Sequence, residues 1–361
     1  MEQPTNEFTV ISKSSNETIQ YVMTSLNPNK DLLKWAQFCE PIFSYKPNPP
    51  SSQYFERHVQ NDPLSSWIRV ILSSNKDFAA SVQTCQRRIS SASNGTSAYY
   101  NSGGIANVVT CPNHRQRGLV KKLLHDSLET IMIPNAMDCS LLHCSPTLIP
   151  VYQSCGYKSV ITPWKRVPVS LQNLVPPSTT NYRIRRAKFP EDTTQLQTLH
   201  QHFSEENYVG CIIRSIEYWN QYIANEIGDK LYVLTSNENI ILAWMAFGDK
   251  FTLYNKLLDF GMDTSSLLSI SDAMGYLFHN FLIQQQREED NNNSISVSMP
   301  TSIWEQVKDA SWILNDDDNS IMPDDDEGWM YKMINPNVPS MIDLISKQGK
   351  IHLIWPADSS L

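Results

Sequence analysis

The residues best suited to bind an anion lie in one short run, Val108-Val-Thr-Cys-Pro-Asn-His-Arg-Gln-Arg-Gly-Leu-Val120. A strand is predicted to end there and a helix to open at about residues 116–118. The first turn of a helix leaves its N–H groups unpaired, and the macrodipole adds about half an elementary positive charge. Gly118 lets the backbone approach a ligand, and Arg115, Arg117 and Lys121 surround the turn with positive charge. The pattern therefore predicts a phosphate-binding turn.

On spacing alone, an ordinary strand-to-helix turn with solvated basic side chains is an equally good interpretation. The Arg-x-x-Gly spacing matches neither a Walker A loop nor a dinucleotide fingerprint. The surrounding sequence has to decide between the two interpretations.

The run Arg115-Gln-Arg-Gly118-Leu-Val120 resembles motif A of the GCN5-related N-acetyltransferase (GNAT) family, with Val120 in place of the usual small residue. Pro150-Val-Tyr-Gln-Ser-Cys-Gly-Tyr157 is similar to the Phe-Tyr-x-x-x-Gly-Phe pattern at the end of motif B. The predicted strand at residues 140–144 precedes it at the distance that the family has. The resemblance covers residues 67–160.

This resemblance implies that acetyl-CoA is the co-substrate, with no metal. The end of the motif A strand would bind the pantetheine arm through its backbone, and the amides of residues 116–121 would hold the diphosphate. Tyr152 matches the tyrosine that protonates the departing thiolate; from the residues alone, an aromatic core residue on a short helix is the favoured interpretation, and the motif reverses that preference. The cofactor-binding residues implied in this way are Val108, Val109, Thr110, Arg115, Gln116, Arg117, Gly118, Leu119, Val120, Lys121, Thr147 and Leu148.

Transfer to an amine requires a proton acceptor, since deprotonating an alkylamine of pKa ~10.4 at neutral pH costs roughly 4–5 kcal/mol. Glu56 and His58 lie where the family often lines the acceptor site, so they are the candidate substrate residues, with a surface or packing role as the alternative. His143 alternates along a predicted core strand and is interpreted as a buried, hydrogen-bonded histidine. No general base is assigned.

The predicted elements form an α+β fold. Strands at residues 67–72, 79–85 and 106–110 precede a helix from residue 119, a strand at 140–144, a helical turn at 151–155 and a strand at 157–160. The alternation returns after a Pro- and Ser-rich linker at residues 175–181. We therefore expect tandem GNAT-like mixed sheets flanked by helices.

The second repeat is expected to be degenerate, since its segment Gly261–Ser266 has no Arg-x-x-Gly and no basic cluster. The predicted domains are residues 1–175, catalytic, and residues 176–361, GNAT-like without the CoA motif. The second half contains strands at 182–187, 231–235, 240–247, 251–260, 294–298 and 329–334, and helices at 193–203, 214–224 and 270–287.

The tandem arrangement resembles enhanced intracellular survival proteins and fungal lysine N6-acetyltransferases, which have endings close to Ile354-Trp-Pro-Ala-Asp-Ser359. In the former the terminal carboxylate is the base, but the final residues differ here, so Leu361 is given no such role. The expected function is transfer of acetyl to a primary amine of a small molecule, with lysine the first candidate. The alternatives are an inactive CoA-binding or regulatory protein and a protein or peptide acetyltransferase.

Composition limits the partners. The 361 residues carry a net charge of −8 and no basic stripe, which disfavours nucleic-acid binding. No apolar run approaches the ~20 residues of a membrane span, and the N-terminus lacks the features of a signal peptide, so a cytoplasmic protein is expected, of undetermined oligomeric state. The acidic clusters at residues 316–318 and 324–327 are interpreted as solvated loops.

Overall fold

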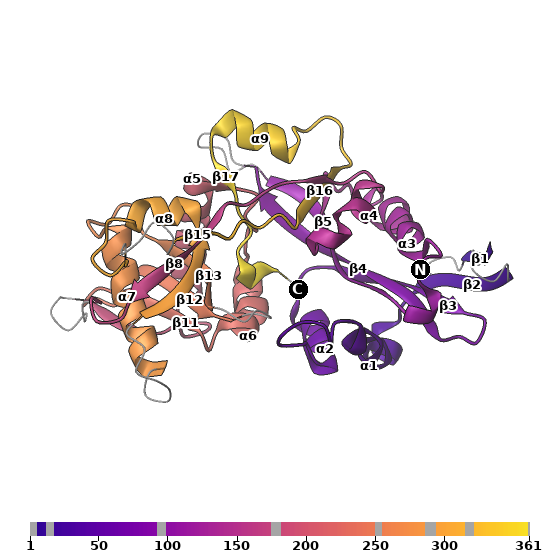
Figure 1. The fold of residues 1–361 in the computed structure, drawn as a ribbon, viewed down its shortest axis with the longest axis horizontal. Helices are drawn as coiled ribbons and strands as arrows, with labels where there is room; N and C mark the ends of the chain where they lie inside the picture. The colour runs from indigo at the N-terminus through magenta and orange to yellow at the C-terminus, as the bar shows by residue number, and fades with distance from the viewer. Residues whose placement is uncertain are drawn as a thin grey trace.

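Two mixed β-sheets flanked by helices form the two halves of the molecule, which lie side by side (Figure 1). The computed structural model describes residues 6–11, 18–91, 99–174, 182–249, 255–285, 294–314 and 321–359. The predicted linker at 175–181 and the acidic residues 316–318 lie outside these ranges. Within them, no helix is long and apolar enough to cross a bilayer.

The first sheet has eight strands in the described part of the chain, and all neighbours are antiparallel except β5 and β6. In spatial order the strands are β1 (Asn6–Ile11), β2 (Thr18–Ser25), β3 (Ser66–Ser73), β4 (Phe78–Ser90), β5 (Tyr99–Thr110), β6 (Cys139–His143), β16 (Trp329–Met333) and β7 (Lys158–Ser159).

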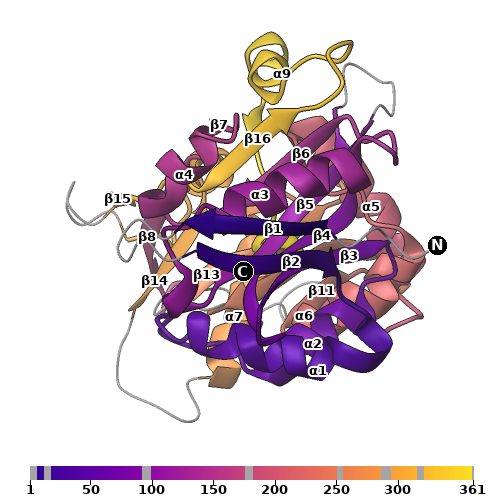
Figure 2. The same ribbon diagram turned by 90° about the vertical axis from the view of Figure 1, so that its right-hand side faces the viewer.

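Helices cover both faces of this sheet (Figure 2). They are α1 (Pro28–Cys39) and α2 (Ser52–Asn61) on one face, and α3 (Leu119–Ser127) and α4 (Ile149–Gln153) on the other. Side chains alternate along β3 accordingly: Ile68 and Val70 join the core under α1 and α2, whereas Ile71 joins the core under α3. Helix α3 forms where the apolar spacing predicts it and continues as a π-helical segment, Leu128–Met132.

The second sheet repeats this plan, with seven strands among the described residues and one parallel pair, β13 and β14. In spatial order they are β15 (Met322–Pro323), β8 (Trp164–Ser170), β14 (Ser294–Pro300), β13 (Asn255–Met262), β12 (Ile241–Gly248), β11 (Leu231–Thr235) and β9 (Arg183–Arg186). The other elements of this half are α5 (Thr193–Asn207), a π-helix (Tyr218–Ile223) continuing into α6 (Ala224–Ile227), α7 (Ile270–Gln285), α8 (Thr301–Val307), α9 (Met341–Gln348) and the small parallel pair β10 (Tyr208–Val209) and β17 (Ile351–His352).

The two halves exchange strands. Strand β16, from late in the chain, inserts between β6 and β7 of the first sheet, whereas β8, from before the predicted linker, pairs with β14 and β15 of the second. The division of the chain at residue 175 therefore does not separate the two sheets. The limits 1–175 and 176–361 stay a prediction about folding units.

Candidate active site

Strands β5 and β6 diverge, which leaves part of β5 uncovered. They pair in parallel only from Ser102 opposite Cys139 to Ile105 opposite Leu142. Beyond that point β5 continues to Thr110, and its register with β4 shifts at a bulge where Asn107 has a φ of 48°. At residues 106–110 no described strand pairs with β5 on the side that faces β6. The backbone groups on that side can therefore bind an extended ligand.

The predicted arm-binding residues differ in where their side chains lie. Val108 lines a cavity beside this edge. Val109 is buried in the core under α1 and α2, so only its backbone can serve a ligand. Thr110 is half-buried and pairs with Ala80 of β4.

The turn after β5 presents unpaired backbone donors. Gly118 caps α3 with a φ of 72°, and Gln116 also has a positive φ, of 61°. In the described part of the chain, no backbone acceptor is bonded to the amides of residues 116–121. No other heavy atom lies within 4 Å of where a Cβ on Gly118 would stand, so the turn is open to a ligand.

The basic residues of this turn are arranged in two ways. Arg115 and Lys121 are exposed and have no side-chain partner among the described residues. Arg117 donates through Nη1 to the Tyr21 hydroxyl at 2.7 Å and to His114 Nδ1 at 2.9 Å. Burial and the Arg117 charge lower the pKa of His114, which keeps this imidazole neutral as the acceptor. Arg117 is therefore a fixed positive charge, and Arg115 and Lys121 are free to reach an anion.

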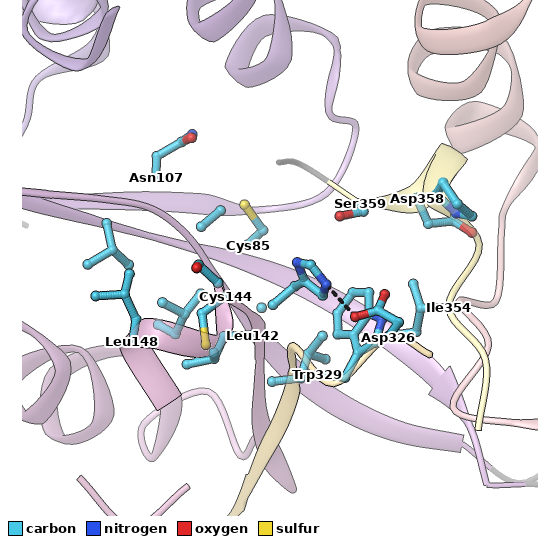
Figure 3. Close-up of a pocket in the computed structure, with 18 of the residues that line it drawn as sticks. Cys85, Asn107, Leu142, Cys144, Leu148, Asp326, Trp329, Ile354, Asp358 and Ser359 are labelled. Atoms are coloured by element: carbon cyan, nitrogen blue, oxygen red, sulfur yellow. Dashed lines mark hydrogen bonds and ion pairs between the residues drawn. The ribbon is translucent and has the colours of Figure 1, made fainter. Parts of the chain in front are cut away.

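A cavity of about 360 Å³ lies between the two sheets and is lined by both halves (Figure 3). The first half contributes Val108, Leu148 and Tyr152, and the C-terminal segment contributes Asp358 and Ser359. The cavity wall also includes His143, Trp164, Lys256, Asp326 and Trp329. In Figure 3, Asn107, Cys144 and Leu148 lie on one side of the cavity, and Asp326, Ile354 and Asp358 on the other.

Tyr152 lies on α4 with 5% of its surface exposed. Its hydroxyl has no hydrogen-bond partner among the described residues, and its ring packs edge-on against Tyr157. Burial raises the pKa of Tyr152, so the phenol stays protonated. Nearby, Thr147 is exposed and lies within hydrogen-bond distance of Ser145, whereas Leu148 forms part of the cavity wall.

His143 and Asp326 are hydrogen-bonded in the cavity wall, with 2.8 Å between Nε2 and Oδ1. Burial raises the pKa of Asp326, but His143, Lys256 and the Gly328 amide together hold it well below its usual value. An ionised Asp326 accepts a hydrogen bond from the Nε2–H group of His143, so Nδ1 is the basic nitrogen of the ring. In the described structure Nδ1 has no partner.

Two sequence interpretations are wrong here. The side chain of His143 is not sequestered in a core but is 32% exposed in the cavity wall. The acidic cluster at residues 324–327 is only partly solvated: Asp325 and Glu327 are exposed, whereas Asp324 and Asp326 are half-buried. Asp324 accepts from Arg166, Asp325 accepts from the Trp164 amide, and Asp326 pairs with His143.

Glu56 and His58, the predicted acceptor-site residues, do not line this cavity. His58 is 3% exposed, and its Nε2 lies 2.7 Å from the Tyr222 hydroxyl, so it packs α2 against the second half. Glu56 is half-buried on the same helix. Their role in binding the acceptor stays a prediction. The sequence did not identify Asp326, Lys256 or Trp329 as residues of the cavity. For Asp326, the acidic cluster at residues 324–327 could have pointed to it.

The C-terminal segment is held beside the cavity by a buried ion-pair network. Arg214 donates to Asp358 at 2.9 and 2.7 Å and to Asp259 of β13 at 2.6 Å, and all three side chains are fully buried. The guanidinium also lies 4.7 Å from the centroid of the Trp219 ring. Leu361 lies outside the described residues.

Replacing Arg214 by methionine should lower the free energy of unfolding by about 3–5 kcal/mol, because Asp259 and Asp358 would remain buried without a counter-charge. Urea denaturation measures this loss. Lys308→Met is the control: Lys308 pairs with Glu305 on the surface, and its removal should leave the midpoint unchanged. A loss for Arg214→Met no larger than that of the control would contradict the assignment.

The sequence of residues 26–160 matches the family model of the acetyltransferase (GNAT) domain. These residues form a GNAT acetyltransferase domain. The match contains the uncovered end of β5, the turn before α3, and Tyr152. This part of the chain therefore belongs to the GNAT family, and acyl-CoA is the donor that this family uses.

Solved structures show that the GNAT fold extends over both halves. A GCN5-related N-acetyltransferase from Anabaena variabilis is 14% identical, with a TM-score of 0.60 over 91% of this chain and 81% of that one. A tandem GNAT protein from the clavulanic acid biosynthesis pathway is 12% identical, with a TM-score of 0.56 over 89% and 99%. Eis1 from Mycobacterium abscessus is 11% identical, with a TM-score of 0.53 over 87% and 73%.

No curated protein sequence matches the chain significantly. At these identities the structural likeness concerns the fold, and it confirms the predicted α+β arrangement of tandem GNAT-like sheets.

Proposed function

We propose that this GNAT protein transfers the acetyl group of acetyl-CoA to a primary amine of a small molecule, with lysine the first candidate. The observation that carries the proposal is the cavity between the sheets. Its lining includes an uncovered strand edge, a protonated phenol and a histidine–carboxylate pair. These are the parts that acyl transfer to an amine requires.

The donor would bind along the end of β5 and the turn that follows. The unpaired amides of residues 116–121 and the charges of Arg115, Arg117 and Lys121 suit a diphosphate. The backbone of residues 108–110 would bind the pantetheine arm, with Thr147 and Leu148 on its far side. Bound acetyl-CoA supplies the thioester carbonyl that reacts.

His143 is the proposed general base. Asp326 holds the imidazole by its Nε2–H, so Nδ1 can accept the proton that the amine nitrogen loses as its bond to the acetyl carbon forms. The resulting imidazolium is stabilised by the Asp326 carboxylate. A backbone amide of β5 would donate to the oxyanion that develops on the carbonyl.

Tyr152 is the proposed general acid. As the carbon–sulfur bond breaks, its phenol would give a proton to the leaving thiolate and later regain one from solvent. Its unpartnered hydroxyl supports this role, because no described side chain competes for the proton.

The cavity also favours a small acceptor over a protein. A volume of about 360 Å³ enclosed between two sheets suits an amino acid or a comparable amine better than a folded surface. The second candidate, a CoA-binding protein without turnover, has no use for the His143–Asp326 pair.

The test combines titration calorimetry with acetyl-CoA and a mass-spectrometric screen of amines and peptides, followed by assay of free thiol release. Acetylation of a small amine with matching thiol release would support the proposal. Acetyl-CoA binding without thiol release from any acceptor would support the regulatory alternative, and modification of peptides alone would support the protein acetyltransferase.

Replacing Tyr152 by phenylalanine should lower kcat by about 100-fold, because the thiolate would leave without its proton donor. Tyr157→Phe is the matched control. Tyr157 packs against Tyr152, but its hydroxyl lies 2.7 Å from Ser140 Oγ and away from the cavity lining. Its kcat should stay near that of the wild type. Equal losses in both variants would contradict the role of Tyr152.

A further inference from the structure

Most charged side chains of the cavity wall have a partner within the protein. Arg87 pairs with Asp62 at 2.7 Å. His143 pairs with Asp326, and Asp358 pairs with Arg214. Lys46 also has a partner. Lys256 also lines the cavity, and in the described part of the molecule its ammonium has neither an ion pair nor a hydrogen bond.

Lys256 lies near the start of β13, opposite Ser298 of β14. Its side chain is half-buried, and Nζ lies 4.1 Å from the centroid of the Trp164 ring. The ring attracts the ammonium through its π face but accepts no conventional hydrogen bond. The donors of this ammonium are therefore available to a ligand in the cavity.

The two carboxylates whose charges act on Lys256 have other hydrogen-bond partners. Asp324 accepts from Arg166 and Ser298, and Asp326 accepts from His143 and the Gly328 amide. Burial lowers the pKa of Lys256, whereas Asp326 and Asp324 act in the opposite direction. A half-buried ammonium without an acceptor is costly, so an anionic group that completes the site would be favoured.

His143, the proposed base, and Lys256 line the same cavity. An acceptor whose amine reaches His143 can place its other end at Lys256. A carboxylate suits that position, because two oxygens can accept charge-assisted hydrogen bonds from one ammonium. A diamine would bring a second positive charge toward Lys256 instead.

We propose that Lys256 binds the carboxylate of the acceptor, so that the acceptor is an amino acid and not a plain alkylamine or polyamine. The inference rests on the proposed function, whose acceptor class it narrows. Lys256 is then the residue that distinguishes an amino acid from its decarboxylated counterpart.

The experiment compares pairs of acceptors that differ only by the carboxylate, lysine with cadaverine and ornithine with putrescine. The wild type should acetylate the amino acid of at least one pair with a kcat/KM about 10- to 100-fold higher than its diamine, the range expected of a charge-assisted hydrogen bond. Lys256→Met should remove this preference, mainly by raising KM for the amino acid. Its kcat/KM for the diamine should fall far less than that for the amino acid, or rise, because the diamine has no carboxylate contact to lose and Lys256 no longer repels its second charge. Lys256→Arg, which keeps the charge, should retain part of the preference.

The outcomes separate the two proposals. If no amine gives thiol release, the proposed function fails. If amines react but the wild type uses each diamine as well as its amino acid, the carboxylate site fails alone. Equal effects of Lys256→Met on both members of a pair would overturn it as well. The comparison of each amino acid with its diamine in the wild type requires no variant. It therefore still tests the carboxylate site if Lys256→Met folds poorly.

Discussion

Replacing His143 by glutamine should lower kcat for amine acetylation by about 10²- to 10⁴-fold, the usual range for loss of a general base. Glutamine has a similar reach and its amide can still donate to Asp326, but it has no basic atom to accept the amine proton. Acetyl-CoA affinity should change little, because the hydrogen-bond partner of His143 is Asp326, and His143 contributes none of the amides or basic side chains proposed to hold the diphosphate. Stopped assays of thiol release and titration calorimetry measure the two quantities separately.

Variants of the carboxylate partner and of a distant histidine sharpen this prediction. Asp326→Asn should give a smaller loss, since the imidazole remains but loses the carboxylate that orients it. His202→Gln, on the exposed face of α5, is the control and should behave as wild type. Activity of His143→Gln within about threefold of wild type would exclude His143 as the base.

Replacing Gly118 by glutamate should abolish measurable acetyl-CoA binding. The carboxylate would stand at the start of α3, where unpaired amides and Arg115 are proposed to hold the diphosphate. Two anions at one site repel, and the new side chain would also occupy the open space around Gly118. Titration calorimetry with acetyl-CoA measures the loss directly.

The backbone at Gly118 requires its own control, because a residue with a Cβ at a φ of 72° costs roughly 1–2 kcal/mol whatever its charge. Gly349 provides the match. It ends α9 with a φ of 64°, and no heavy atom lies within 4 Å of its missing Cβ. Gly349→Glu should lose similar stability and keep full acetyl-CoA affinity. Equal loss of binding in the two variants would show that strain, and not charge, is responsible.

The two variants address different halves of the reaction. Gly118→Glu removes the donor site and leaves the His143–Asp326 pair in place. His143→Gln removes the proposed base and leaves the donor site in place. A protein that loses binding in the first and only turnover in the second has the donor and acceptor sites proposed for it.

The sequence alone determined the parts of the site that are local. The turn at residues 115–118, the helix from Leu119 and the helical segment that carries Tyr152 were all predicted from neighbouring residues. The strand at residues 231–235 and the start of the helix at Ile270 were also predicted at their observed positions. Helix and strand periodicity, turn residues and caps act within a few positions, so these features are legible without the fold.

Only the tertiary structure decided which distant segments meet. Asp326 reaches His143 across 183 residues, and Arg214 reaches Asp358 across 144. The first contact follows from the insertion of β16, which comes just after Asp326, beside β6, which carries His143. An alternating apolar pattern shows that a strand forms but not which strand it pairs with, since pairing is selected by the free energy of burying both sheets together. The base and the unpaired cation Lys256 are products of that selection.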